Sequence, residues 1–232
     1  MRKEAQIIFQ DPYSSLNPRM TVYDLISAPL EVYKVGTKEE RREMVEEILQ
    51  EVGLDKQYLN RFPHEFSGGQ RQRIGIARAL ILNPEFVVCD EAVSALDVSV
   101  RAQVLNLMEK YAAEEKSDLP VYLHDLSVVR HISDRIAVMY LGNIVEVIPG
   151  EDVAKNSLHP YTQALLGAQF SIHMDQHKKI ESIESEAPSP LDVPHGCPFQ
   201  NRCEHCMEKC KTTRPVLKEM EAGHEVACHY VT

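Results

Sequence analysis

Hydrophobic residues in the first 150 positions follow two spacings, one typical of helices and one typical of buried strands. The helical spacing covers Lys38–Glu51, where Thr37 precedes the pattern as an N-cap and Gly53 follows it. A second helical pattern begins after Ser67-Gly68-Gly69, with its apolar stripe on one face. The same spacing predicts further helices over 98–115, 126–132 and 159–168.

Short apolar runs bounded by polar residues predict the strands. The run Phe86-Val87-Val88-Cys89 ends in Asp90-Glu91 and is typical of a central parallel strand with both faces buried. Other strands are predicted at 6–9, 121–123, 136–140 and 144–148, with a hairpin-type turn at Gly142-Asn143 between the last two. Because strands alternate with helices, the predicted fold class is α/β with a largely parallel sheet.

A change in composition near residue 150 predicts two parts, 1–150 and 151–232. Residues 171–194 are polar, poor in aromatic residues and contain three clustered prolines, which is typical of a linker. This linker leads to a tail at 195–232 that holds five of the six cysteines. In a cytosolic chain such a cluster indicates a metal site more often than disulfides.

Charge and hydropathy narrow the class of partner. Across 232 residues the net charge is −10 and the pI is near 5.5, which argues against a nucleic-acid partner because phosphate binding needs a basic surface. No apolar stretch approaches the ~20 residues that span a bilayer, and residues 1–6 do not resemble a signal peptide. We therefore expect a cytoplasmic chain that other proteins hold at a membrane, if it works there.

Two segments carry candidate phosphate chemistry. Ser67-Gly68-Gly69-Gln70 precedes an amphipathic helix, whose free N–H groups attract an anion and whose glycines permit close approach. Asp90-Glu91 follows an apolar strand, where one carboxylate can organise Mg²⁺ and its neighbour can position a water molecule. His124 and Gln10 each follow a strand as well. Taken singly, each of these features also fits an ordinary cap or strand end.

In their order and spacing these segments, with Ser94–Asp97, resemble the Q-loop, signature, Walker B, D-loop and H-switch of an ABC ATPase. The resemblance implies a partial ABC ATPase domain over 1–150, with a helical subdomain at about 13–82. It implies that Glu91 is the general base, that His124 clamps the γ-phosphate and that Asp90 organises Mg²⁺. It assigns ATP and Mg²⁺ binding to Gln10, Ser67, Gly68, Gly69, Gln70, Asp90 and Asp97.

Segments 11–18, 159–166 and 196–203 resemble the ATP-binding subunits of oligopeptide and dipeptide importers, and 89–97 resembles the second of their two paired ATPases. The resemblance implies a paired ABC ATPase in a head-to-tail dimer, two membrane permeases and, indirectly, an external peptide-binding protein. It places the chain at the cytoplasmic face of the membrane. Surfaces within about 13–66 are expected to receive the permeases.

The sequence departs from the family in two places. It contains no Gly-Lys dipeptide, so the Walker A loop that holds the β- and γ-phosphates is absent from these residues, and an N-terminally truncated chain is expected. The strand before His124 is shorter than in the family, and it ends in Leu123 where the family has a small residue. One alternative is a non-catalytic subunit that lends its signature motif to a partner, and another is a metal-binding remnant.

The spacing of Cys197, Cys203, Cys210 and Cys228 resembles that of importer subunits that carry a [4Fe–4S] cluster. Cys206 is additional, and the Cys203/Cys206 pair can instead support zinc. The zinc ligands would then include one of His205, His224 and His229. Reduced thiols without metal are the third reading, and the sequence leaves all three open.

Overall fold

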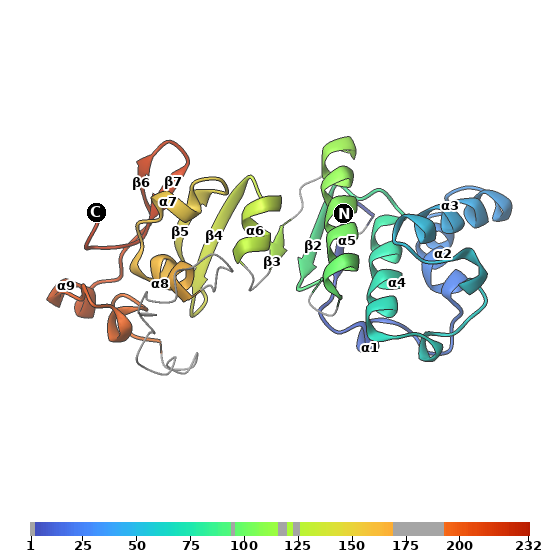
Figure 1. The fold of residues 1–232 in the computed structure, drawn as a ribbon, viewed down its shortest axis with the longest axis horizontal. Helices are drawn as coiled ribbons and strands as arrows, with labels where there is room; N and C mark the ends of the chain where they lie inside the picture. Colours follow the sequence, from blue (N-terminus) through green and yellow to red (C-terminus); the bar gives the residue numbers. More distant parts are fainter. Residues whose placement is uncertain (1–2, 94–95, 116–119, 123–125, 169–192) are drawn as a thin grey trace. The chain divides into compact units, whose positions relative to one another are not determined.

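The computed structural model describes residues 3–93, 96–115, 120–122, 126–168 and 193–232. The chain divides into two compact units, Met1–His124 and Asp125–Thr232 (Figure 1). Both strands of the hairpin at 135–149 belong to the second unit, and the domain boundary near residue 150 stays a prediction. The predicted linker at 171–194 lies almost entirely outside the described residues.

The first unit is built on a parallel sheet in the order β1-β2-β3. Strand β1 (Ala5–Ile8) pairs with β2 (Phe86–Asp90), and β2 pairs with β3 (Val121–Tyr122), so the parallel sheet is confirmed. One face of β2 is buried through Val87 and Cys89. On the other face Phe86 is 41% exposed, so the prediction that both faces are buried is wrong for this side of the strand.

Helices cover the buried face of this sheet and continue the same core (Figure 1). Their bounds are α1 (Pro12–Ser15), α2 (Val22–Val32), α3 (Lys38–Glu51), α4 (Gly68–Leu80) and α5 (Val98–Glu115), with 3-10 turns η1 (Lys56–Tyr58) and η2 (Pro63–Glu65). Helix α4 contacts α1, α2, α3 and β1. Thr37 and Ser67 cap α3 and α4 through capping boxes, as the sequence predicts. Helix α4 therefore contacts both the sheet and three other helices.

The second unit holds an antiparallel sheet in the order β4-β5-β7-β6. Its strands are β4 (Arg135–Tyr140), β5 (Asn143–Pro149), β6 (Lys218–Glu221) and β7 (His224–Val226). Tyr140 pairs with Asn143, so the turn consists of Leu141 and Gly142, both with positive φ, one residue earlier than predicted. The helices are α6 (Leu126–Ile132), α7 (Val153–Asn156), α8 (Pro160–Ala168) and α9 (Glu208–Thr212), with the 3-10 turn η3 (Gln200–Arg202).

A buried carboxylate joins three segments of this second unit. Glu146 on β5 is fully buried, and its Oε1 accepts hydrogen bonds from His224 Nε2 at 2.8 Å and from Leu158 N at 2.7 Å. Its Oε2 accepts from His159 N at 3.3 Å. Burial lowers the pKa of His159 to about 4, so that ring is neutral at neutral pH. Glu146 thus fastens the start of α8 and the tail strand β7 to the sheet.

In the part of the chain that the structure describes, no helix has the length and apolar character needed to cross a bilayer.

Candidate functional site

The structure brings Gln10 and Glu91 together although 81 positions separate them in the sequence. Nε2 of Gln10 donates a hydrogen bond to Oε2 of Glu91 at 2.7 Å. Gln10 follows β1, and Glu91 follows β2, and the parallel pairing of the two strands puts both ends at one edge of the sheet. The hydrophobic pattern predicted that each residue follows a strand. The parallel register of the two strands explains why the two side chains meet.

The backbone fixes where Glu91 lies. Its N–H donates to the carbonyl oxygen of Tyr122 at 3.1 Å, which continues the pairing of β2 with β3 by one residue. Its φ is 45°, in the left-handed region, so the chain turns sharply here. Asp90 is the exposed last residue of β2. Two adjacent carboxylates are therefore held at the carboxyl end of a central strand, where ligands bind in open α/β sheets.

Ser67 and Gln70 close the N-terminus of α4 by bonding to each other. The Ser67 hydroxyl accepts from Gln70 N at 3.3 Å, and the Gln70 side chain accepts from Ser67 N at 3.0 Å. Ser67 is exposed, and Gly68 and Gly69 are half-buried. A Cβ placed on Gly68 would meet no atom within 4 Å, so the packing of this chain does not require glycine there. The surface at Gly68 therefore has free space that an atom of a ligand could occupy.

Asp97 makes local contacts and does not join the Gln10–Glu91 pair through any hydrogen bond described. Its carboxylate accepts from Val100 N at 3.0 Å and from Ser99 Oγ at 2.8 Å. The bond from the Val100 backbone, followed by the bond from the Ser99 hydroxyl, lowers the pKa of Asp97. The carboxylate is thus ionised and caps the start of α5. His124, Ser94 and Ala95 lie outside the described residues.

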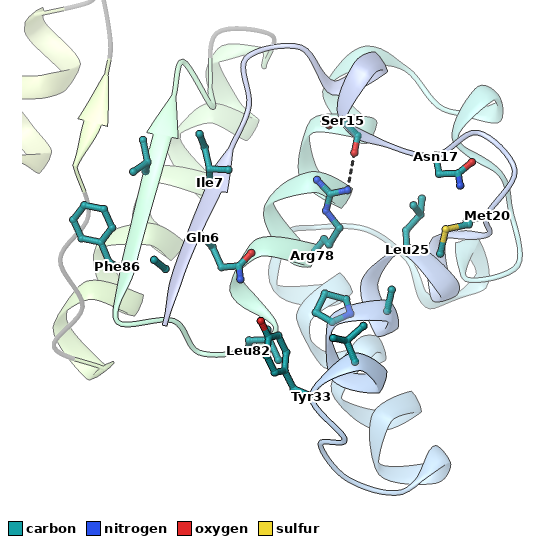
Figure 2. A pocket seen from close by; sticks show the side chains of 15 residues that line it. Gln6, Ile7, Ser15, Asn17, Met20, Leu25, Tyr33, Arg78, Leu82 and Phe86 are labelled. Carbon is teal, nitrogen blue, oxygen red and sulfur yellow. Dashed lines mark hydrogen bonds between the residues drawn. The ribbon is translucent and has the colours of Figure 1, made fainter. Parts of the chain in front are cut away.

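A groove of about 730 Å³ lies in the first unit beside the uncovered face of the sheet. Figure 2 shows Ile7 and Phe86 of the sheet facing this space, with Leu25 and Tyr33 of the α2 region across it. The lining is mostly apolar. Val32, which also lines the groove, is 73% exposed at the end of α2. This groove is separate from the Gln10–Glu91 pair, since neither residue lines it.

The cysteines of the tail interact with one another but do not form a ready metal site. Burial raises the pKa of Cys203 to about 11, and the neighbouring thiols of Cys228, Cys197 and Cys206 raise it further. Cys197 N donates to the carbonyl oxygen of Cys210 at 2.7 Å. Among the described residues, no three or more His, Cys, Asp or Glu side chains are grouped so that they could hold a metal ion. Burial likewise raises the pKa of Cys197, so this thiol and that of Cys203 favour the protonated form in the described structure.

Two polar contacts near Gln10 are absent from the sequence predictions. Gln72, which is 1% exposed, donates its amide to the carbonyl oxygen of Phe9, the residue before Gln10, at 3.2 Å. The Arg71 guanidinium lies 3.6 Å from the centre of the Tyr13 ring. The available signal was that Gln72 precedes Ile76 by one helical turn and so lies on the apolar side of α4.

Comparisons with known proteins show which families the chain resembles. Two protein-family models match the chain: "ABC transporter" over residues 1–94 and "Oligopeptide/dipeptide transporter, C-terminal region" over residues 145–210. The first match includes Gln10, Ser67–Gln70, Asp90 and Glu91. The second begins in β5 and ends at Cys210.

Characterised relatives are similar over nearly the whole chain. The oligopeptide transport ATP-binding protein AppF of Bacillus subtilis is 51% identical over 99% of this chain and 70% of its own length. The oligopeptide transport ATP-binding protein OppF of Escherichia coli is 49% identical over 98% of this chain and 69% of its own length. The di/tripeptide transport ATP-binding protein DppF of Pseudomonas aeruginosa is 44% identical, and 71% of it is covered. The chain thus spans about 70% of the length of these relatives.

Solved structures share part of the fold. The ATP-binding cassette MJ0796, in a dimeric post-hydrolysis state bound to ADP and phosphate, is 30% identical with a TM-score of 0.59. That match covers 65% of this chain and 65% of the MJ0796 chain. A second dimeric structure of this bacterial ABC transporter cassette matches with a TM-score of 0.57. The partial ABC ATPase fold expected from the sequence is therefore confirmed.

Proposed function

Because the chain belongs to the family of ATP-binding subunits of oligopeptide and dipeptide ABC transporters, we propose that it couples ATP hydrolysis to peptide uptake. The observation that carries the proposal is the contact of Gln10 with Glu91 at the end of β2, beside Asp90. An amide and two carboxylates at the carboxyl edge of a parallel sheet suit a Mg²⁺-dependent phosphoryl-transfer site.

The proposed roles follow from where the side chains lie. Glu91 acts as the general base that orients and deprotonates the attacking water, and Gln10 holds that carboxylate through its hydrogen bond and would be a ligand for Mg²⁺. Asp90 would hold Mg²⁺ through its coordination shell. The capped N-terminus of α4 at Ser67–Gln70 offers backbone N–H groups to the phosphates of a nucleotide held by a second subunit. Bound Mg²⁺ would neutralise charge on the phosphates.

The remaining assignments follow from the resemblance of the sequence motifs to those of ABC ATPases. Asp97 stands at the D-loop position, and its ionised carboxylate caps α5. His124 is kept as the residue that clamps the γ-phosphate. The dimeric state of the MJ0796 cassette supports pairing with a second ABC ATPase, and we propose that this pair is arranged head to tail. We further propose that the subunit works with two permeases and, indirectly, a peptide-binding protein, at the cytoplasmic face of the membrane, and has no nucleic-acid partner.

A second candidate is a subunit that donates only its signature motif to a partner's site. The capped but open N-terminus of α4 favours this role as much as the first, and the 232 residues contain no Gly-Lys dipeptide. The two candidates differ in Glu91, which the donor role does not use. A third candidate is a metal-binding remnant. It assigns no function to the hydrogen bond between Gln10 and Glu91.

Peptide-stimulated hydrolysis tests the proposed function. The transporter is purified with this subunit in its assembled complex, and ATP hydrolysis is measured with an oligopeptide, a dipeptide, a nickel salt and a sugar. We expect stimulation by a peptide in the presence of the binding protein, and none by the sugar. Stimulation by nickel or sugar alone would contradict peptide uptake, and the two peptide lengths separate the subclasses.

Replacing Gly68 with alanine separates folding from function. Since a Cβ here meets no neighbour and φ is not positive, the free energy of unfolding should stay the same or rise by roughly 0.4–1 kcal/mol. Hydrolysis by the assembled dimer should fall about 10-fold or more, because the methyl group enters the space left for the phosphates. Gly75 on the same helix, also with nothing within 4 Å, provides the matched control Gly75→Ala. Equal activity of both variants would contradict a ligand at Gly68.

The metal of the tail is a separate proposal. Four cysteines of one unit, Cys197, Cys203, Cys210 and Cys228, are proposed to carry a [4Fe–4S] cluster, with zinc at Cys203 and Cys206 as the alternative. Its support is the cysteine spacing and the mutual interaction of the thiols, whereas the described side chains are not grouped for a metal.

Metal analysis after anaerobic purification decides between them. For the cluster we expect brown protein with about four iron atoms per chain, lost in Cys210→Ser. Cys89→Ser is the control, because Cys89 is buried in the other unit. Colourless protein with one zinc would support the alternative, and absence of both metals would contradict both.

A further inference from the structure

Helix α4 contacts the segment 9–15, which carries Gln10 and then α1, on both sides of Gln10. Before Gln10, the Gln72 amide donates to the carbonyl oxygen of Phe9 at 3.2 Å. After it, the Arg71 guanidinium lies over the Tyr13 ring. At the end of α1, Arg78 donates to the carbonyl oxygen of Ser15 at 2.6 Å, drawn as the dashed line in Figure 2.

Among these contacts, the one made by Gln72 lies closest to Gln10 in the chain. Gln72 is 1% exposed, so water does not compete for its amide, and an unpaired amide at this depth is costly. Phe9 itself is 46% exposed, so little side-chain packing holds the loop at this point. The hydrogen bond from Gln72 is therefore the buried polar contact that fixes the peptide immediately before Gln10.

We infer that Gln72 is a positioning residue that sets the place of Gln10, and through it the hydrogen bond of Gln10 to Glu91. The same helix begins at Ser67–Gln70, so one rigid element carries both the signature motif and the support of the Gln10 loop. This inference rests on the proposed function, because Gln72 matters for hydrolysis only if Gln10 and Glu91 form an ATPase site. Gln72 touches neither nucleotide nor metal in this assignment.

Hydrogen exchange and kinetics on the assembled complex test the inference with Gln72→Met, which keeps the length and apolar stem of the side chain. Backbone amides of the segment 9–16 should exchange about 2- to 10-fold faster, as expected for the loss of one neutral hydrogen bond. The kcat for ATP should fall about 10- to 100-fold, since Glu91 loses its orientation, while KM changes little.

Arg41→Met is the matched control, because Arg41 also donates from a helix to a carbonyl, Val35 O at 2.8 Å, away from Gln10. It should change neither exchange at 9–16 nor kcat. Gln72→Glu is the second variant: a carboxyl buried here donates to Phe9 O only when protonated, so its kcat should recover as the pH falls.

The outcomes separate this inference from the proposed function. Unchanged exchange at 9–16 in Gln72→Met, or faster exchange with unchanged kcat, would overturn the positioning role. If kcat falls by the same factor in Gln72→Met and in Arg41→Met, the positioning role is overturned as well. Wild-type complex without ATP hydrolysis would instead overturn the proposed function, and the exchange result would still decide whether Gln72 holds the loop.

Discussion

ATP hydrolysis by the assembled transporter is expected to fall about 10²- to 10⁴-fold when Glu91 is replaced by glutamine, the range that general-base catalysis contributes. The substitution keeps an oxygen that can accept the 2.7 Å hydrogen bond from Gln10, so the local geometry is preserved. It removes the negative charge that takes the proton of the attacking water. Affinity for ATP should therefore be retained while the chemical step is lost.

The control for Glu91→Gln is Glu85→Gln, an exposed residue just before β2 at the opposite end of the same strand. Glu85→Gln should hydrolyse ATP at the wild-type rate. If Glu91→Gln retains more than about a tenth of the wild-type rate, general-base catalysis by this residue is contradicted. In that case the signature-donor function is the better account, because it does not use Glu91.

The second unit is expected to lose about 3–5 kcal/mol of unfolding free energy when Glu146 is replaced by alanine, because each buried donor left without an acceptor costs about 1–3 kcal/mol. The change leaves His224 Nε2 and the N–H groups of Leu158 and His159 buried without their acceptor. Three segments would be released together: β5, the start of α8 and β7. Hydrogen exchange in 143–149 and 224–226 under urea measures this loss locally.

Two variants bracket the effect of Glu146→Ala. Glu146→Gln keeps the side-chain volume and one carbonyl acceptor, so its loss should be smaller than that of alanine. Glu151→Ala, at an exposed position of the same unit, should change the unfolding free energy by less than about 0.5 kcal/mol. A loss of less than about 1 kcal/mol in Glu146→Ala would contradict the tethering role of this carboxylate.

Local patterns predicted the helices that have caps and a single apolar face. Helix α3 begins and ends where Thr37 and the apolar spacing place it. Helix α2 was not predicted, because Pro29 lies inside it and its buried residues include Ser27, which blurs the helical spacing. Strand β6 was missed as well, since Lys218–Glu221 is exposed throughout and shows no alternation.

The roles of the candidate site residues were predicted from the family resemblance, whereas the contacts between these residues become visible only in the fold. Gln10 and Glu91 were named from their order along the chain, but their contact comes from the parallel register of β1 and β2. Gln72–Phe9 and Glu146–His224 join residues 63 and 78 positions apart, and no local pattern encodes such pairs. A charge within the apolar run of β5 was the one visible sign of Glu146.

The central claim is most directly tested by measuring uptake of a labelled oligopeptide into proteoliposomes that contain the assembled transporter with this subunit. We expect uptake that requires ATP and Mg²⁺ on the side of the subunit, that stops with Glu91→Gln and that continues with Glu85→Gln. Uptake that proceeds equally with Glu91→Gln, or a complex that hydrolyses ATP without accumulating peptide, would contradict the account.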